Sequence, residues 1–342
     1  MPIVEKLCKR ENGQWECGLE EDIKEAKKAI NMIGAAKDLF YKALKEHNYV
    51  PQSFKEATIE EEIYFKRFFE VEVNDENLEL VTQGKIAPDA ILGSGGCGDG
   101  ECMSFNINWC AFSNLADNNE AQHALFVAFH ELIHLEEARK IKPPAKSSVD
   151  GTIFYESLTN LKAKRLLEKV CGDNILPRTE QIDCGYMTNI GTINYQIPTQ
   201  LVDNLITAMD LDIDELIKDG INNKENHRAN IIGHFKNAGT SFIADISPPL
   251  EKMYQLIYDS RKRDLTQIEK QRIGKIIDKI QKTTKDIYTH KHPNATREEK
   301  QAFTQNFIDT SKTYTQTKFL CELCGIEPEQ KNIDKGNVKD YC

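Results

Sequence analysis

The stretch FVAFHELIHLEEARK, from Phe126 to Lys140, decides how the central part of this chain folds. His130 and His134 are four residues apart, and Glu131 follows the first histidine. Apolar residues recur around them at helical spacing, so we expect a helix from about Asn118 to Ile141. Because residues i and i+4 lie on one face of a helix, both imidazoles can reach the same metal ion.

This HExxH arrangement is typical of zinc hydrolases. Zinc lowers the pKa of a coordinated water molecule to about 7, and a neighbouring carboxylate can then take its proton. His130 and His134 are therefore the expected metal ligands, zinc is the expected cofactor, and Glu131 is the expected general base. The alternative is an amphipathic helix whose two histidines bind no metal.

A catalytic zinc also needs a third protein ligand and one open position. We expect a second helix from about Thr152 to Val170, and Glu156 near its start is the candidate third ligand. Asp150, just before this helix, and His123 are the alternatives. Asn160 lies one turn after Glu156, so it is expected to hold a metal-binding histidine in orientation.

A strand is expected at Met103–Trp109, because apolar and polar residues alternate there. A substrate peptide can pair with a strand beside the metal helix, so Phe105, Ile107 and Asn108 are the expected substrate-binding residues. A core strand without substrate contact is the alternative. The glycine-rich segment Gly93–Gly98 matches a dinucleotide-binding pattern, but a strand rather than a helix follows it, which argues against such a site.

HELIH followed by a helix that carries Glu156 resembles the gluzincin metallopeptidases, the class that includes thermolysin. The segment YESLTNL resembles the EGLTEY-type third-ligand segment of a small bacterial subgroup, and the likeness covers about residues 90–240. This resemblance implies that the two histidines and Glu156 bind zinc and that the glutamate after the first histidine is the base. Two residues depart from the subgroup's pattern: Ser157 replaces a usual glycine, and Asn160 a common acidic residue.

The predicted fold class is α+β, a mostly helical zincin-like domain with a small antiparallel sheet and additional C-terminal helices. The metallopeptidase domain is expected to cover residues 1–248. Within it, a hairpin and helices occupy residues 1–90, and the catalytic core occupies residues 90–240. Residues 249–342 are expected to form a helical C-terminal region that packs on this core.

The C-terminal region has an apolar stripe at helical spacing. Its members are Leu265, Ile268, Ile273, Ile276, Ile277 and Ile280. Packing on the main body is the simpler interpretation, and a protein partner that binds through these helices is the alternative.

Composition excludes several classes of function. The chain has 342 residues and a net charge of −10, and its isoelectric point is about 5.4. This charge argues against nucleic-acid binding and against an anionic membrane surface as a partner. No apolar run approaches the roughly 18 residues that span a bilayer, and the N-terminus lacks the apolar region of a secretory signal. We therefore expect a cytoplasmic protein, with export without a signal peptide as the open alternative.

The ten cysteines are expected to be reduced thiols, because the chain is long and has no secretory signal. A structural zinc site is the alternative. Cys8 and Cys17 flank a turn signal, and Cys321 and Cys324 form a CxxC pair that can supply the other two ligands.

Together these patterns predict a zinc-dependent metallopeptidase that acts on a peptide or protein substrate. An effector-type metalloprotease that acts on a host protein is one alternative, and a non-catalytic zincin-fold binding or scaffold protein is another. His227, His234, Tyr155 and Tyr195 are candidate donors to the oxyanion, and the sequence does not choose among them.

Overall fold

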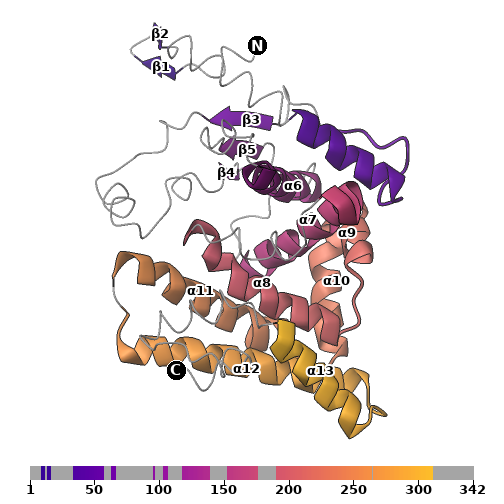
Figure 1. Cartoon of the computed structure of the whole chain (residues 1–342), viewed down its shortest axis with the longest axis vertical. Helices are drawn as coiled ribbons and strands as arrows, with labels where there is room; N and C mark the ends of the chain where they lie inside the picture. Colours follow the sequence, from indigo (N-terminus) through magenta and orange to yellow (C-terminus); the bar gives the residue numbers. More distant parts are fainter. Residues whose placement is uncertain are drawn as a thin grey trace. The chain divides into compact units, whose positions relative to one another are not determined.

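The structure is a computed structural model, and its described residues are predominantly helical (Figure 1). The described residues are 9–11, 14–16, 34–57, 63–66, 95–96, 103–106, 118–138, 152–175, 190–263 and 265–310. None of the helices described is long and apolar enough to cross a membrane.

The helices follow one another along most of the described chain. Residues 34–46 form the first helical segment. The labelled α-helices are α6 (Asn118–Ala138), α7 (Thr152–Ile175), α8 (Ile190–Ala208), α9 (Ile213–Asn222), α10 (Lys224–Asn237), α11 (Ser247–Lys262), α12 (Gln267–Lys291) and α13 (Arg297–Thr310). A π-helix, η5 (Phe242–Ile246), directly precedes α11. Pro248 and Pro249 lie in the first turn of α11, where proline is compatible with a helix.

The predicted α+β fold class is wrong, because the small antiparallel sheet is not seen among the residues whose side chains the structure describes. About 82% of the residues whose side chains the structure describes are helical, and none of them lies in a strand. The largest fully buried side chains come from helices. Phe40, Phe129, Phe154 and Phe235, each fully buried, come from four separate helical segments. Only the mostly helical character agrees with the prediction.

The strands that the backbone forms are short and lie in two groups. β1 (Lys9–Glu11) pairs antiparallel with β2 (Gln14–Glu16). The second group has the order β3 (Ile63–Lys66), β5 (Met103–Asn106), β4 (Gly95–Gly96). β5 is parallel to β3 and antiparallel to β4, so this small group is mixed rather than antiparallel.

β5 is the middle strand of its group rather than an edge strand. Gly96 and Gly95 pair with Met103 and Ser104 on one side, and β3 pairs with the whole of β5 on the other. Met103 and Ser104 are therefore paired on both sides, and the substrate-binding role of Phe105, Ile107 and Asn108 stays a prediction. β3 lies within residues 1–90, where a hairpin and helices were expected, and its Ile-Tyr-Phe run favours a strand.

The chain divides into two compact units. The first comprises Met1–Ser147, Lys162–Ile182 and Ile217–Glu225, and the second comprises Ser148–Leu161, Asp183–Leu216 and Asn226–Cys342. Three helices, α7, α9 and α10, contribute residues to both units.

The core of the first unit contains α6 and the helical segment 34–46. The rings of Phe40 and Phe129 meet edge to face, with centroids 5.4 Å apart. Leu132 and Ile133 on α6 are also fully buried. α9 contributes to the same unit through Asn222, whose side-chain amide donates to the backbone carbonyl of Tyr49 at 2.8 Å. The helix that carries the HExxH motif is therefore held by packing on several sides.

The core of the second unit contains the start of α7, α8 and α10 to α12. Phe154, Phe235 and Phe242 form an aromatic cluster with ring centroids 5.0 to 5.6 Å apart. α12 packs on α8 and α11 and buries Ile273, Ile277 and Ile280 (Figure 1). This contact buries much of the apolar stripe of the C-terminal region. Ile268 is the exception, with 70% of its surface exposed.

Candidate metal centre

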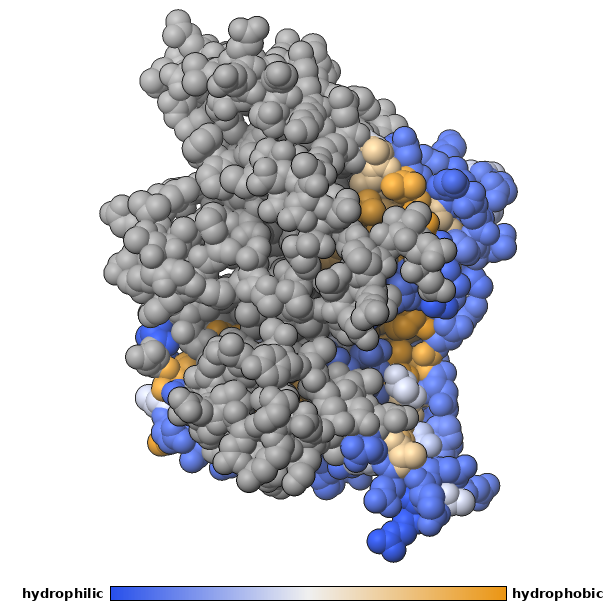
Figure 2. Space-filling view, viewed as in Figure 1, coloured by the Kyte–Doolittle hydropathy of each residue, from blue (hydrophilic) through white to orange (hydrophobic). Residues whose placement is uncertain are grey.

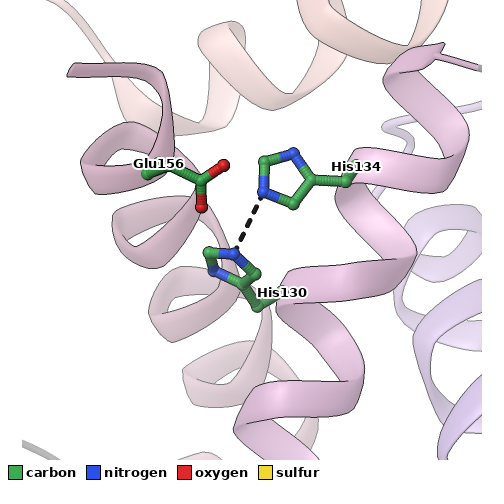
Figure 3. Close-up of side chains that lie close together, drawn as sticks. All are labelled: His130, His134 and Glu156. Carbon is green, nitrogen blue, oxygen red and sulfur yellow. Dashed lines mark hydrogen bonds between the residues drawn. The ribbon is translucent and has the colours of Figure 1, made fainter. Parts of the chain in front are cut away.

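α6 presents His130 and His134 on the same side of the helix. Most other positions around them are buried, including Phe129, Leu132 and Ile133, whereas the two histidines are half-buried. Their Nε2 atoms lie 3.0 Å apart, and their ring centroids are 4.6 Å apart at an interplanar angle of 78° (Figure 3). A helix that is buried on its other faces thus leaves two imidazoles partly accessible.

Glu156 on α7 points its carboxylate toward the two imidazoles (Figure 3). One ligand atom from each of His130, His134 and Glu156 lies within 4.8 Å of the other two. Within the described part of the chain, no other group of three such side chains meets this spacing. All three are half-buried, so each keeps part of its surface exposed to solvent.

The three side chains fit a zinc ion by donor type and by spacing. Two imidazoles and one carboxylate are a donor set of catalytic zinc sites, in which a fourth position stays open. Two nitrogen atoms at about 2.0–2.1 Å from a tetrahedral zinc lie about 3.3 Å apart. The observed 3.0 Å between the Nε2 atoms of His130 and His134 is close to this value.

Contacts at the start of α7 position Glu156. The backbone N–H of Ile153, one of the first-turn donors without an intrahelical partner, donates to Oε1 of Glu251 on α11 at 2.9 Å. The buried hydroxyl of Ser157 donates to the carbonyl of Ile153 at 2.7 Å. The departure from glycine at Ser157 therefore places a satisfied hydroxyl inside the helix, directly after the candidate ligand.

Glu136 anchors α6 two residues after His134. Its side chain is fully buried and accepts a hydrogen bond from the Tyr41 hydroxyl, which in turn accepts one from the backbone N–H of Ala57 at 3.0 Å. Nζ of Lys224 lies 3.6 Å from the second carboxylate oxygen of Glu136. Sequence analysis missed this role, because a glutamate on a helix usually faces solvent.

The remaining predicted site residues on α6 and α7 occupy distinct surroundings. Glu131 is half-buried and directly follows His130 on α6. Asn160 is 6% exposed, and its amide donates to Oγ1 of Thr199 on α8 at 3.2 Å. The described hydrogen bond of Asn160 therefore goes to α8, and its predicted contact with a metal-binding histidine is not among the bonds found.

Several predicted residues lie outside what the structure describes. Ile107, Asn108 and Asp150 are not among the described residues, and only the backbone of Phe105 is described, in β5. The side chain of His123 is likewise not described. The cysteines of the alternative zinc site, Cys8, Cys17, Cys321 and Cys324, also lie outside the described residues. Their predicted roles stay predictions.

Tyr155, a candidate oxyanion donor next to Glu156, is covered by a cation. The guanidinium carbon of Arg228 on α10 lies 4.6 Å from the centroid of the Tyr155 ring. His227, the neighbour of Arg228, is 4% exposed, whereas His234 is exposed. Tyr155 is half-buried and comes from the same helix as Glu156. Arg228 was not predicted, because cation–π contacts between distant segments have no sequence signature.

Comparison of the chain with known protein families, with curated proteins and with solved structures finds no match.

Proposed function

We propose that this protein is a zinc-dependent metallopeptidase. The single observation that supports the proposal is the approach of His130, His134 and Glu156, whose ligand atoms all lie within 4.8 Å of one another. Glu156 lies on a different helix from the histidine pair. If the two histidines belonged to an ordinary amphipathic helix that binds no metal, nothing would require a carboxylate beside them. The two-imidazole, one-carboxylate set is also the set used by zinc peptidases.

Each residue of the proposed site has a separate task. His130, His134 and Glu156 would hold the zinc ion and leave one position open. Zinc, when bound, supplies a Lewis acid and lowers the pKa of water to about 7. Glu131 accepts a proton from the attacking water and delivers it to the leaving amine of the cleaved peptide bond. The partial exposure of all three ligand residues supports access for a peptide.

The glutamate and the ligands can be tested separately. We expect the purified protein to bind about one equivalent of zinc and to cleave members of a mixed peptide library, with products detected by mass spectrometry. Glu131→Gln keeps the size of the side chain and removes its basicity, so it is expected to retain zinc and to lose cleavage by about 10²-fold or more. Cleavage by Glu131→Gln at the wild-type rate would contradict the mechanism.

The two alternative functions differ from this proposal in measurable ways. A non-catalytic zincin-fold binding protein would bind zinc and cleave no member of the library. An effector-type metalloprotease would share the chemistry of the site and differ only in its substrate. Profiling of cleavage sites therefore distinguishes it from a peptidase that cleaves proteins of the cell that makes it. Failure to bind zinc would overturn the metallopeptidase proposal and the effector alternative, and would favour a scaffold that acts through its C-terminal region.

A further inference from the structure

A pocket of about 430 Å³ lies on the second unit, away from the residues of the metal centre in sequence. One wall comes from α12, and the other comes from η5 and the first turns of α11. All of its lining residues belong to the second unit, and α12 contacts both η5 and α11. We call this pocket the α11–α12 groove.

α12 buries one face in the core, and the residues that line the groove lie beside that face, with Ile276 partly buried against the core. Ile273, Ile277 and Ile280 are buried in the core of the unit. The residues that line the groove on this helix are Arg272, Lys275, Ile276 and Lys279. Their spacing of three, four and seven residues places them in one row along the helix. This row spans about 10 Å of helix.

The groove has a cationic rim. Lys252 on α11 faces the pocket together with Arg272, Lys275 and Lys279, and all four are exposed. The lining contains no acidic residue, and within the described residues none of these four cations forms a salt bridge. Four cations around one pocket are distinctive in a chain whose net charge is −10.

The rest of the lining is apolar. Ala244, Pro248, Pro249 and Ile276 contribute the apolar part of the lining. Two large apolar side chains next to the lining are exposed. Ile243, beside Ala244 in η5, is 57% exposed, and Ile268, one turn before Arg272 on α12, is 70% exposed. Across the described residues only one other large apolar side chain, Leu39, is classed as exposed.

From this combination we infer that the α11–α12 groove binds an acidic peptide segment that also carries apolar side chains. Charge complementarity requires an anionic partner, because a cationic segment would meet four like charges. The exposed isoleucines and the apolar lining residues require side chains that can be buried, and nucleic acid and a single phosphate group both lack them. On the described face in Figure 2, most residues are hydrophilic and the hydrophobic areas are small and separate.

The inference can be tested by direct binding with the full-length protein. The probe is a labelled peptide of about ten residues in which glutamate alternates with leucine, long enough to cover the row on α12. A second peptide has serine in place of leucine and the same charge. Fluorescence anisotropy is expected to show tighter binding of the glutamate–leucine peptide and weaker binding as salt increases.

Charge variants with the same net charge separate the groove from general electrostatics. The groove variant is K252Q/R272Q/K275Q/K279Q. The control variant is K236Q/K285Q/K291Q/R297Q, which removes four exposed cations of the same unit that do not line the pocket. The groove variant is expected to bind the peptide about ten-fold more weakly or worse, and the control variant within about two-fold of wild type. Equal losses in both variants would overturn the inference.

The apolar contribution has its own test. I243S/I268S changes two exposed side chains, so folding is retained, as circular dichroism can confirm. This variant is expected to weaken binding of the glutamate–leucine peptide several-fold and to leave the glutamate–serine peptide unchanged. If the wild-type protein binds the glutamate–leucine and the glutamate–serine peptides with equal affinity, the inference is contradicted. Groove-dependent binding of single-stranded DNA or phosphatidylserine vesicles that is tighter than binding of the peptide would also contradict it.

These measurements involve neither zinc nor hydrolysis. Their outcome is therefore independent of the proposed metallopeptidase function. If the groove binds no peptide, the metallopeptidase proposal is unaffected, and the reverse also holds.

Discussion

Nζ of Lys162 on α7 lies 2.5 Å from Oε1 of Glu137 on α6, and the Lys162 side chain is 1% exposed. Glu137 is 20% exposed and follows His134 by less than one turn. This ion pair therefore joins α6 to α7 at a place that is largely shielded from water. Both residues belong to the first compact unit.

We expect Glu137→Gln to destabilise the protein by about 3 kcal/mol. The substitution takes a negative charge away from an ammonium group that water scarcely reaches, and the desolvation cost of that ammonium remains. Lys162→Met leaves a carboxylate with partial access to water, so its cost is expected to be smaller, about 1–2 kcal/mol. Urea denaturation of both variants measures the difference. A larger loss for Lys162→Met than for Glu137→Gln would contradict this account.

Gly220 on α9 lies against the same ion pair. A Cβ atom at this position would be 2.2 Å from Oε1 of Glu137 and 3.1 Å from Nζ of Lys162. Gly220→Ala is therefore expected to displace the Glu137 carboxylate and to destabilise the protein by about 1–2 kcal/mol, although alanine is the better helix former. Thermal denaturation measures this change.

Gly233 on α10 is the matched control for Gly220. A Cβ atom there meets nothing within 4 Å, so Gly233→Ala should give the helix-propensity gain alone, about 0.5–1 kcal/mol of added stability. The two glycine substitutions are thus expected to have opposite signs. If Gly220→Ala stabilises the protein, the ion pair rearranges around the added methyl group without loss of stability, and the prediction for Gly220 is wrong.

A capping box provides hydrogen-bond acceptors for backbone N–H groups at the N-terminus of α12. The Thr266 hydroxyl accepts from the backbone N–H of Glu269 at 3.3 Å, and the Glu269 carboxylate accepts from the backbone N–H of Thr266 at 2.9 Å. Thr266→Ala is expected to cost about 1 kcal/mol, because it removes the cap, whereas Thr266→Ser keeps the hydroxyl and much of the stability. Chemical denaturation of the two variants provides the comparison.

Stability in acid should depend on Glu269. A bidentate hydrogen bond from Arg263, together with the bonds from Thr266, holds the pKa of the Glu269 carboxyl far below its usual range. Because the pKa of Glu269 is lower in the folded state than its unfolded value of about 4.3, the interactions of its carboxylate stabilise the folded protein fully above about pH 4.3. This stabilisation is lost as the pH falls through the folded pKa. The stability difference between wild type and Glu269→Gln should therefore shrink in acid. A difference that is constant from pH 7 to pH 2 would contradict this assignment.

Helical periodicity predicted much of the fold. The spacing of apolar residues around the HExxH motif predicted α6, and the stripe from Leu265 to Ile280 predicted that the C-terminal helices pack inward, as Ile273 and Ile277 do. Periodicity is informative there because each helix buries one continuous face. The extent of α8 does not follow from apolar spacing alone, because the helix begins at Ile190 and continues through Pro198, a residue that usually interrupts a helix.

The candidate site was predictable only in part. The positions of His130 and His134 follow from the four-residue spacing, and the approach of Glu156 was expected from a second helix that returns past the first. The buried polar anchors were not predictable. Charged residues such as Glu136, Glu137 and Lys162 are typical of a solvated helix face. Only the tertiary packing of α6, α7 and the segment 34–46 pairs Glu136 with Tyr41 and Glu137 with Lys162.

Zinc is expected to stabilise the protein through His130, His134 and Glu156, because an ion that binds only the folded state shifts the unfolding equilibrium. At a free zinc concentration about 100 times Kd, the added stability is about 2.7 kcal/mol. His134→Ala should abolish this gain, and Glu156→Gln should reduce it strongly. His234→Ala, which removes an exposed histidine of α10, is the control and should retain it. Differential scanning calorimetry with and without zinc gives the comparison, and equal stabilisation of wild type and His134→Ala would exclude this site as the zinc ligand set.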